Sequence, residues 1–385
     1  MANAVVVGGG VIGLSVAWRA AQRGLTVTVA DPAPARGASH VAAGMLTPVS
    51  EAAYHEKELL RLGVASLERY PGFVAELASV TGAQAGFRQT GTLQVGYDAD
   101  DLAVIGELHV MQQSLGVGAR PLTARECREL EPMLDPSVRG GLLVEGDGSV
   151  DPRLLTRALL AAVRRCGVRV IRQPVTGITP PGTAGRSPAV VRLADGAAIS
   201  ADQVVLAAGW RSAHIDGLPP ECLPPVRPVK GQILRLRATG ADGAQILPSR
   251  SVRGIVRGSS VYLVPRESGE LVVGATQEEM GTDTRVTAGG VWELLRDARA
   301  LVPGITELQF AEATAALRPG TPDNAPVLGP SGTPGVVLAT GHFRHGVLLA
   351  PITADIIADY LECGSMPEAG AHFTIERFRR GGMRS

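Results

Sequence analysis

The chain has 385 residues, of which 45% are hydrophobic, and its 37 basic and 37 acidic residues give a formal net charge of zero. This balance argues against nucleic-acid binding, which needs a basic surface, and the apolar content argues against a disordered chain. No stretch reaches the roughly 18 consecutive apolar residues of a membrane span, so we expect a globular protein that binds neither nucleic acid nor a membrane.

A βαβ unit is predicted at the start of the chain. Residues 4–7 are apolar and indicate a strand, a helical pattern runs to about Arg23, and residues 25–30 indicate a second strand. The apolar N-terminus lacks the basic residues of a signal peptide, and its pattern continues directly into the helix. We therefore expect a cytoplasmic protein whose first element is part of the fold.

A glycine-rich turn joins the first strand to the helix. Gly8, Gly10 and Gly13 form the pattern G-x-G-x-x-G. The first glycine permits the tight turn, the second lets the backbone approach a pyrophosphate, and the third lets the helix pack closely on the strand. The helix N-terminus then offers free N–H groups to the phosphates. Asp31 follows about twenty residues later, where an acidic residue accepts hydrogen bonds from a ribose. The motif predicts a dinucleotide site but does not distinguish NAD from FAD.

Later segments are predicted to complete two different sheets. Residues 204–210 indicate a buried strand that ends in glycine, and a stretch rich in proline and glycine at 179–188 indicates a surface turn. Near the C-terminus the pattern predicts a strand, a turn and a long apolar helix, at 335–339, 340–346 and 347–361. Two β-rich segments, at 230–237 and 260–275, predict an antiparallel sheet.

These elements predict a mixed α/β fold with two discontinuous domains. A Rossmann-like nucleotide-binding domain is assigned to residues 1–86, 146–222 and 318–385. A substrate-binding domain with a mainly antiparallel sheet is assigned to residues 87–145 and 223–317. The four cysteines lie far apart and show none of the paired spacings of a disulfide framework or a zinc site, so neither is expected. They are Cys127, Cys166, Cys222 and Cys363.

Several further motifs occur in order along the chain. They are residues 41–46 (VAAGML), 228–231 (PVKG), 261–266 (VYLVPR), 317–323 (LRPGTPD) and 340–346 (TGHFRHG). With these motifs the sequence resembles the D-amino-acid oxidase superfamily of FAD-dependent oxidoreductases, and within it the glycine oxidases of thiamine biosynthesis, over nearly the whole chain. The resemblance implies a D-amino-acid-oxidase-like fold and FAD as the cofactor. Related sarcosine oxidases hold flavin through a cysteine that has no counterpart here at 315–318, which implies noncovalent FAD.

The resemblance also implies which residues bind the cofactor. It places Ser39 near the phosphates, residues 42–46 beside the isoalloxazine ring and Val175 at the adenine. The N-terminus of the predicted helix 347–361 is directed at the N1–C2=O locus, where its positive dipole would stabilise the anionic reduced flavin. The full set is Gly8, Gly10, Val11, Ile12, Gly13, Asp31, Pro32, Ser39, Ala42, Ala43, Gly44, Met45, Leu46, Val175, Gly209, Trp210, His342, Phe343, Arg344, His345, Gly346, Val347 and Leu348.

The same resemblance places the substrate against Arg318 and Tyr262. Arginine binds a carboxylate through two parallel hydrogen bonds, and a tyrosine hydroxyl can add another. From composition alone, a surface ion pair would be the better interpretation of Arg318, because more than thirty arginines compete. Arg318 precedes Pro319 and Gly320, which predicts a rigid turn at the floor of a pocket. No catalytic acid or base is assigned, because the hydride is transferred to the flavin.

Three positions differ from the usual family sequence. Ser260 stands where a histidine is common, Gln277 where a methionine is common, and His345 where an asparagine is common. Ser260 and Gln277, together with Arg344, are predicted to border the substrate. These differences leave the identity of the amine substrate open.

The resemblance implies oxidative deamination of glycine, and possibly of sarcosine or small D-amino acids, with molecular oxygen as the acceptor. The products are an imine that hydrolyses to glyoxylate, ammonia and hydrogen peroxide, and the imine can instead be passed to thiazole synthase. Family members often form tetramers, so a homo-oligomer is expected. The alternatives are an oxidase of another small primary or secondary amino acid, a dehydrogenase of the same fold, and a nicotinamide-binding or non-catalytic flavin-binding protein.

Overall fold

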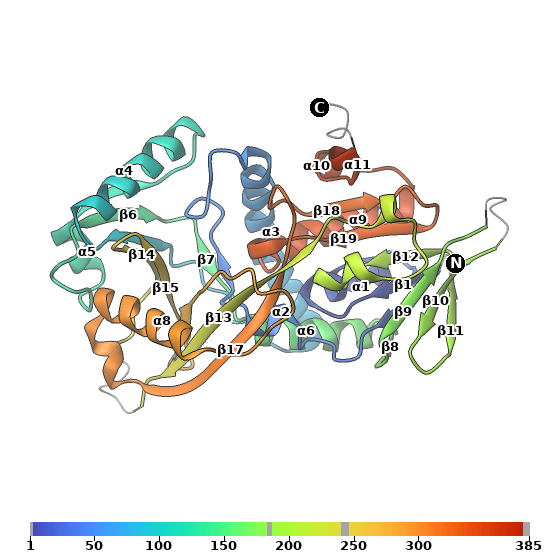
Figure 1. The fold of residues 1–385 in the computed structure, drawn as a ribbon, viewed down its shortest axis with the longest axis horizontal. Coiled ribbons are helices and arrows are strands. Elements are labelled where there is room, and N and C mark those ends of the chain that lie inside the picture. Colours follow the sequence, from blue (N-terminus) through green and yellow to red (C-terminus); the bar gives the residue numbers. More distant parts are fainter. Residues whose placement is uncertain (1–2, 183–186, 240–245, 380–385) are drawn as a thin grey trace.

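A computed structural model describes residues 3–182, 187–239 and 246–379. Two large sheets dominate these residues and lie in different halves of the molecule (Figure 1). The predicted mixed α/β fold is confirmed. The surface turn predicted at 179–188 lies partly outside the described residues.

The first large sheet has six strands and contains the predicted βαβ unit. All neighbouring strands are parallel except the pair β18 and β19. The side chains of its central strand β1 alternate between the two faces of the sheet. Val6 packs into one buried cluster, and Val5 and Val7 pack into another on the opposite face. In spatial order the strands are β18 (Val327–Pro330), β19 (Val336–Thr340), β12 (Gln203–Leu206), β1 (Asn3–Val7), β2 (Thr26–Ala30) and β8 (Arg169–Ile171).

Helices cover one face of this sheet and a small sheet covers the other. Helix α1 (Val11–Gln22) packs against α6 (Pro152–Arg165) and α9 (Ala350–Cys363), and the long helix α3 (Lys57–Thr81) packs against α6 and α9. On the other face lies a three-stranded antiparallel sheet, which buries Ile178 and Val191 against Val5 and Val7. Its strands are β9 (Val175–Thr179), β10 (Ala189–Leu193) and β11 (Ala198–Ala201).

The second large sheet has eight strands and is mainly antiparallel, with β4 and β14 as its parallel pair. Its strands in spatial order are β17 (Gln309–Gly320), β13 (Arg227–Arg237), β16 (Glu270–Gly274), β15 (Ser259–Pro265), β14 (Ser251–Val256), β4 (Thr92–Gly96), β6 (Gly140–Val144) and β5 (Arg120–Thr123). The long strands β13 and β17 run through the middle of Figure 1, toward the six-stranded sheet. Side chains of the eight-stranded sheet can therefore reach the six-stranded sheet.

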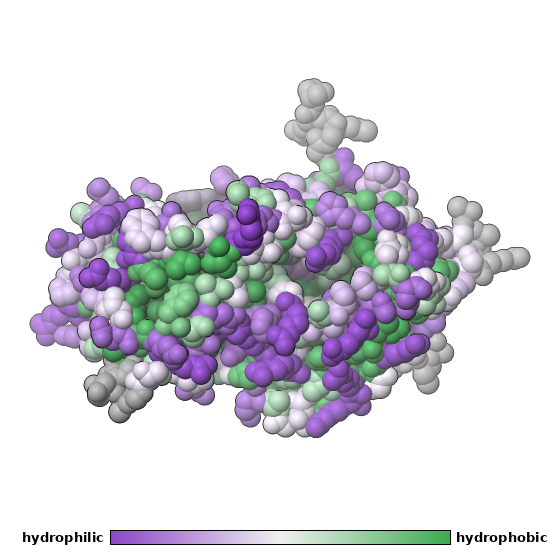
Figure 2. Space-filling model, turned by 60° about the horizontal axis from the view of Figure 1, so that its bottom comes forward, coloured by the Kyte–Doolittle hydropathy of each residue, from purple (hydrophilic) through white to green (hydrophobic). Residues whose placement is uncertain are grey.

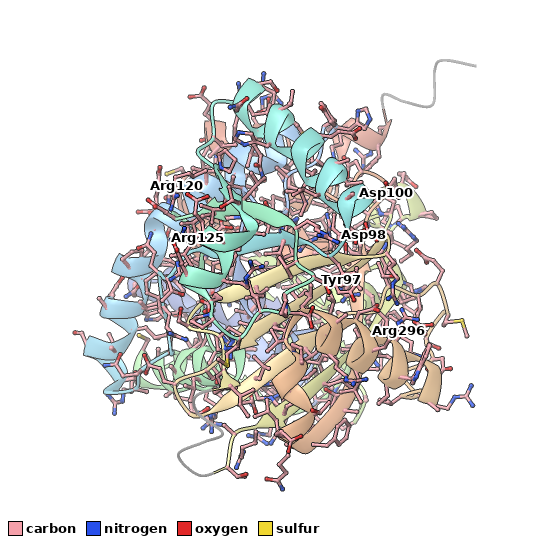
Figure 3. All side chains as sticks on the ribbon, turned by 90° about the vertical axis from the view of Figure 1, so that its left-hand side faces the viewer. Tyr97, Asp98, Asp100, Arg120, Arg125 and Arg296 are labelled. Carbon is pink, nitrogen blue, oxygen red and sulfur yellow. The ribbon has the colours of Figure 1, made fainter. Side chains whose placement is uncertain are left out.

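Three helices complete this half of the molecule. Helix α8 (Ala288–Leu301) packs on β13 to β16, while α4 (Ala99–Ser114) and α5 (Ala124–Leu130) pack at the other end of the sheet. The side chain of Asp98 accepts a hydrogen bond from Asp101 N–H (2.9 Å), and the Asp101 carboxylate accepts one from Asp98 N–H (3.3 Å), so a capping box begins α4. Figure 3 shows Asp98 and Asp100 together at this end of the helix.

Short elements connect the two halves and the C-terminal segment. They are α2 (Ala38–Val41), β3 (Met45–Leu46), β7 (Gly148–Ser149), α10 (Glu368–Ala371), α11 (Glu376–Arg379) and the 3₁₀ helices η1 (Gly209–His214), η2 (Pro220–Cys222), η3 (Pro303–Glu307) and η4 (Phe343–His345). An ion pair of Arg153 on α6 with Glu312 on β17, with N–O distances of 2.8 and 2.9 Å, joins the halves directly.

Three boundary predictions were wrong. The strand predicted at 204–210 ends at Leu206, and Gly209 and Trp210 lie in η1. The helix predicted from Val347 begins at Ala350, because residues 346–349 form turns and Pro351 occupies the first helical turn. Arg318 to Gly320 lie within β17 and form no turn, because β17 is an edge strand, where proline is tolerated.

The surface carries apolar side chains on the half that contains the eight-stranded sheet (Figure 2). In that half, Trp292 and Phe310 are 60% and 50% exposed and border a shallow hollow beside α8. Within the described residues, no helix combines the length and the apolar character needed to span a bilayer.

Candidate functional site

The glycine-rich turn after β1 leaves room for a ligand at one of its three glycines. Gly8 has a φ of 110°, and a side chain there would collide with the backbone of Ala207. A side chain at Gly13 would collide with the carbonyl of Gly8. At Gly10, by contrast, an added Cβ would meet only the Ser39 hydroxyl, at 3.4 Å. Packing of the protein itself therefore requires Gly8 and Gly13, whereas Gly10 faces open space.

Two polar side chains border the N-terminus of α1. The Asp31 carboxylate accepts the N–H groups of Gly9 and Ala33, both at 2.7 Å, and the Ser39 hydroxyl accepts the N–H of Val11 at 3.1 Å. Gly10 is the N-cap and has no side chain to occupy the remaining first-turn N–H groups. This helix end, like others of its kind, is suited to an anion.

Four segments predicted to bind the cofactor meet at one edge of the six-stranded sheet. Gly8 follows β1, Asp31 follows β2, Gly209 follows β12 and His342 follows β19, and these strands are mutually parallel. Ligands of open α/β sheets bind at the carboxyl ends of the strands. Val175 lies elsewhere, at the start of β9 in the small sheet, where it packs on the cluster that contains Val5 and Val7.

The segment 42–46 lies between the two halves of the molecule. Gly44 has a φ of 74°, and its carbonyl accepts the N–H of Val150 at 2.9 Å. Ala43 and Met45 pack with Ile233 and Tyr262 of the large sheet. The segment predicted to pass the flavin ring is thus held against the sheet that carries Tyr262.

The turn before α9 presents unpaired backbone donors. Within the described residues, the N–H groups of Gly346, Val347 and Leu348 donate no hydrogen bond, although Val347 and Leu348 are buried. Their carbonyls are satisfied from α3, because Tyr70 donates to Val347 (2.5 Å) and Ser66 to Leu348 (2.6 Å). Buried N–H groups are rarely left unpaired, so this turn is suited to an acceptor on a ligand.

His342 and His345 differ in their surroundings. The imidazole of His342 lies 3.0 Å from the Thr353 hydroxyl, and burial lowers the pKa of His342 to about 3. Burial also lowers the pKa of His345, although the nearby Glu51 acts in the opposite direction. Both side chains are therefore neutral near pH 7.

Arg318 and Tyr262 project from the face of the large sheet that meets the segment 42–46. The Nη1 of Arg318 donates to the carbonyl oxygens of Thr276 (3.1 Å) and Lys230 (3.4 Å). Among the described residues, no carboxylate forms an ion pair with Arg318. Burial raises the pKa of Tyr262 while Arg318 acts to lower it, so Tyr262 keeps its proton as a donor.

Two other arginines near this site, Arg253 and Arg344, face carboxylates. Arg253, which lies opposite Tyr262 on the next strand, contacts Glu51 at 2.7 Å. Arg344 lies 3.8 Å from Glu56. Burial acts to raise the pKa of Glu51, but Arg253 and its other neighbours hold that pKa below its usual value, so Glu51 is ionised.

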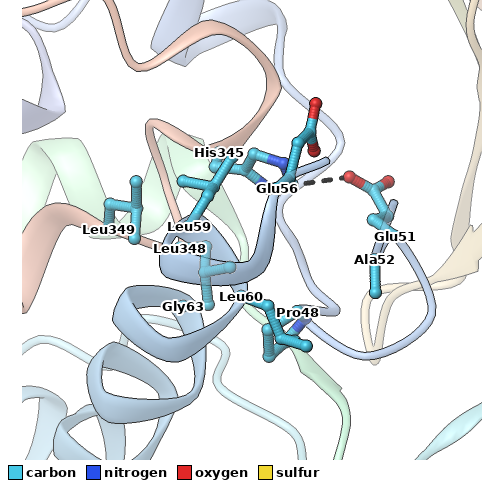
Figure 4. Close-up of a pocket in the computed structure, with 10 residues that line it drawn as sticks. All are labelled: Pro48, Glu51, Ala52, Glu56, Leu59, Leu60, Gly63, His345, Leu348 and Leu349. Atoms are coloured by element: carbon cyan, nitrogen blue, oxygen red, sulfur yellow. Dashed lines mark ion pairs between the residues drawn. The ribbon is translucent and has the colours of Figure 1, made fainter. Parts of the chain in front are cut away.

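A small cavity of about 10 Å³ lies beside this cluster, between the loop 48–52 and the turn before α9 (Figure 4). Glu51 and His345 face each other across it, with 3.6 Å between Oε2 and Nδ1. The volume is about that of one water molecule.

Sequence reasoning missed Glu51, Glu56 and Arg253. Glu51 follows the quoted 41–46 motif by five residues, which was an available signal. No signal marks Arg253, because its place opposite Tyr262 depends on strand pairing. Of the other predicted substrate residues, Ser260 shares the sheet face of Tyr262 and is exposed, and Gln277 is exposed just beyond β16.

Replacing Asp147 with asparagine is expected to make stability less dependent on pH. Asp147 is buried behind the loop 48–52 and accepts a hydrogen bond from Ser50. Burial raises the pKa of Asp147 to about 7, so from about pH 4 to about pH 7 the folded state keeps a proton that the unfolded state releases. Wild-type stability therefore falls as pH rises through this range.

Urea unfolding of both proteins at about pH 5 and about pH 8 measures this effect. The stability of Asp147→Asn relative to wild type should be higher at the upper pH. An equal difference at both pH values would contradict the interpretation.

Comparisons with known proteins cover nearly the whole chain. Residues 3–360 match the family described as FAD dependent oxidoreductase. The chain is 33% identical over 380 residues to the bifunctional protein ThiO/ThiG of Trichormus variabilis, which covers 98% of this chain and 55% of that protein. The chain thus spans about half the length of such bifunctional relatives.

In two further comparisons, the alignment covers almost all of both chains. Identity to the glycine oxidase of Geobacillus kaustophilus is 30%, over 94% of this chain and 93% of that protein. The crystal structure of glycine oxidase from the same organism superposes with a TM-score of 0.86 at 29% identity, covering 97% of this chain and 99% of the other. The predicted D-amino-acid-oxidase-like fold is confirmed.

Proposed function

Because the chain belongs to the family of FAD dependent oxidoreductases, we propose that it is an oxidase of glycine or another small amino acid. The observation that carries this proposal is that Arg318 lacks a carboxylate partner among the described residues. Its guanidinium lies beside Tyr262 and has no carboxylate partner among the described residues, whereas Arg253 and Arg344 face Glu51 and Glu56. A substrate carboxylate would supply the missing partner.

The residues at the sheet edge fit FAD. The open space at Gly10, the first-turn N–H groups of α1 and the Asp31 carboxylate suit a pyrophosphate and a ribose. The unpaired N–H groups of Gly346, Val347 and Leu348 suit an acceptor on the flavin ring. When bound, FAD supplies the hydride acceptor. Noncovalent attachment is part of the proposal.

Arg318 and Tyr262 would orient the substrate. The guanidinium binds the carboxylate through two charge-assisted hydrogen bonds, and the Tyr262 hydroxyl donates a third. Such positioning holds the Cα hydrogen toward the neighbouring segment 42–46, and orientation of this kind can lower a barrier by several kcal/mol.

The site offers no free general base in the described residues. Glu51 is held by Arg253, and the imidazole of His345 faces Glu51. We therefore propose that the substrate amine loses its proton before or during binding. Glycine, oxygen and water would then yield glyoxylate, ammonia and hydrogen peroxide. We further propose that the imine formed from glycine can pass to a thiazole synthase, and that the protein is a homo-oligomer.

An anaerobic titration of the purified protein with glycine tests the proposal. Loss of the flavin absorbance near ~450 nm, followed by its recovery and by peroxide when air is admitted, is the expected result. A yellow protein that glycine does not bleach would reject glycine and direct the test to sarcosine and D-alanine. Bleaching without peroxide in air would instead indicate a dehydrogenase.

A further inference from the structure

The guanidinium of Arg318 occupies the space where a side chain of strand β13 would begin. Gly231 lies on β13, adjacent to β17, which carries Arg318. A Cβ built on Gly231 would fall less than 3.0 Å from Nη1, Nη2 and Cζ of Arg318. The guanidinium therefore rests directly on the Gly231 backbone, and no other residue type leaves that space free.

Tyr262 has the same relation to a glycine on the neighbouring strand. Gly274 of β16 is the register partner of Tyr262 on β15 and of Ile233 on β13. A Cβ on Gly274 would fall less than 3.0 Å from the hydroxyl oxygen and Cζ of Tyr262. The phenol thus lies across the Gly274 backbone, and its hydroxyl is directed from β15 over β16, toward the side of the sheet that carries β13 and β17.

A positive φ does not explain either glycine. Gly231 and Gly274 are absent from the glycines with positive φ, so neither position needs glycine for the left-handed region. What excludes a side chain at each position is the group that lies on it. In both cases that group is the far end of a flexible side chain proposed to bind the substrate carboxylate.

We infer that Gly231 and Gly274 are positioning residues that form the floor of the carboxylate site. Their missing side chains let Arg318 and Tyr262 lie flat on adjacent strands and converge on one ligand. This inference rests on the proposed function. It adds that Gly231 on β13 determines the location of the Arg318 guanidinium, and with it the affinity for a carboxylate.

Gly231→Ala is the informative variant, because the added methyl group displaces a movable guanidinium and leaves the backbone in place. Gly289→Ala on α8 is a matched control, since a Cβ there meets nothing within 4 Å. Glycolate, which has a carboxylate but no amine, is the probe. Its dissociation constant is measured from perturbation of the flavin spectrum, together with KM and kcat for glycine, the FAD content and Tm.

Gly231→Ala should weaken the binding of glycolate and raise KM for glycine, each by about tenfold or more. A displacement of about 1 Å at a positioning group can lower the reaction rate by up to 10²-fold. FAD content and Tm should match those of Gly289→Ala. In the background of Arg318→Ala, the same substitution should have no further effect on glycolate affinity, since the group it moves is gone.

Three results would overturn the inference: unchanged glycolate affinity and KM, a parallel loss of FAD or Tm, or an equal effect in the Arg318→Ala background. These outcomes are distinct from failure of the proposed function. In that case the wild-type protein itself would neither bind glycolate nor be reduced by any amino acid tested. Gly274→Ala provides a second, independent variant with the same expected pattern.

Discussion

Arg318→Ala is expected to lower kcat/KM for glycine by roughly 10²–10⁴-fold, mainly through KM, while the protein keeps its FAD. The variant loses two hydrogen bonds between charged groups, which contribute about 1.5–3 kcal/mol each, and each 1.4 kcal/mol corresponds to a factor of ten. Arg318 contacts backbone carbonyls of the large sheet, and its removal leaves the Gly10 and Gly346 segments untouched. Steady-state kinetics and the ratio of absorbance at ~450 nm to that at ~280 nm measure the two effects.

Two matched variants sharpen this test. Arg299→Ala removes an exposed arginine from α8 and should leave both KM and FAD content unchanged. Arg318→Lys keeps the charge but loses the planar fork, so it should recover only part of the lost kcat/KM. If Arg318→Ala released FAD while glycine affinity per flavin stayed constant, the assignment of Arg318 to the substrate would be wrong.

Gly10→Leu is expected to give a folded but colourless protein. An added Cβ at this position meets only the Ser39 hydroxyl, and the φ of Gly10 is −77°, so neither the Cβ contact nor the backbone conformation opposes a side chain here. The larger side chain fills the space where a pyrophosphate would approach the N-terminus of α1. Loss of about 3 kcal/mol in phosphate contacts would lower the affinity for FAD roughly 100-fold.

Absorbance near ~450 nm after purification, and titration of the apoprotein with FAD, measure this loss. Circular dichroism should show an unchanged fold. Gly72→Ala on α3, where an added Cβ meets nothing within 4 Å, is the control and should remain yellow. A yellow Gly10→Leu protein with normal FAD affinity would place the cofactor elsewhere.

The local sequence determined the nucleotide-binding half of the fold. The βαβ unit was predicted nearly to the residue, with β1 at Asn3–Val7, α1 at Val11–Gln22 and β2 at Thr26–Ala30. Glycine spacing and apolar periodicity are short-range signals, since the strand, turn and helix they specify are adjacent in the chain. The family of the chain was likewise recognisable, because its motifs recur in a fixed order.

The ends of later elements were less predictable. The helix expected from Val347 begins at Ala350, and Gly346, Val347 and Leu348 instead present unpaired N–H groups in a turn. The carbonyls of Val347 and Leu348 accept hydrogen bonds from Tyr70 and Ser66 of α3, more than 270 residues earlier in the chain. A contact of that range overrides the local helical pattern and is invisible in it.

The amino-acid sequence by itself thus determined the glycine-rich dinucleotide motif and the mixed α/β fold. It also identified Arg318 and Tyr262 as candidate substrate-binding residues. Only the tertiary structure decided what surrounds them. Strand pairing places Arg253 opposite Tyr262 and β13 beside β17, so that Glu51 neutralises Arg253 and Gly231 lies beneath Arg318. These relations depend on register between segments distant in sequence, and side-chain period alone does not encode register.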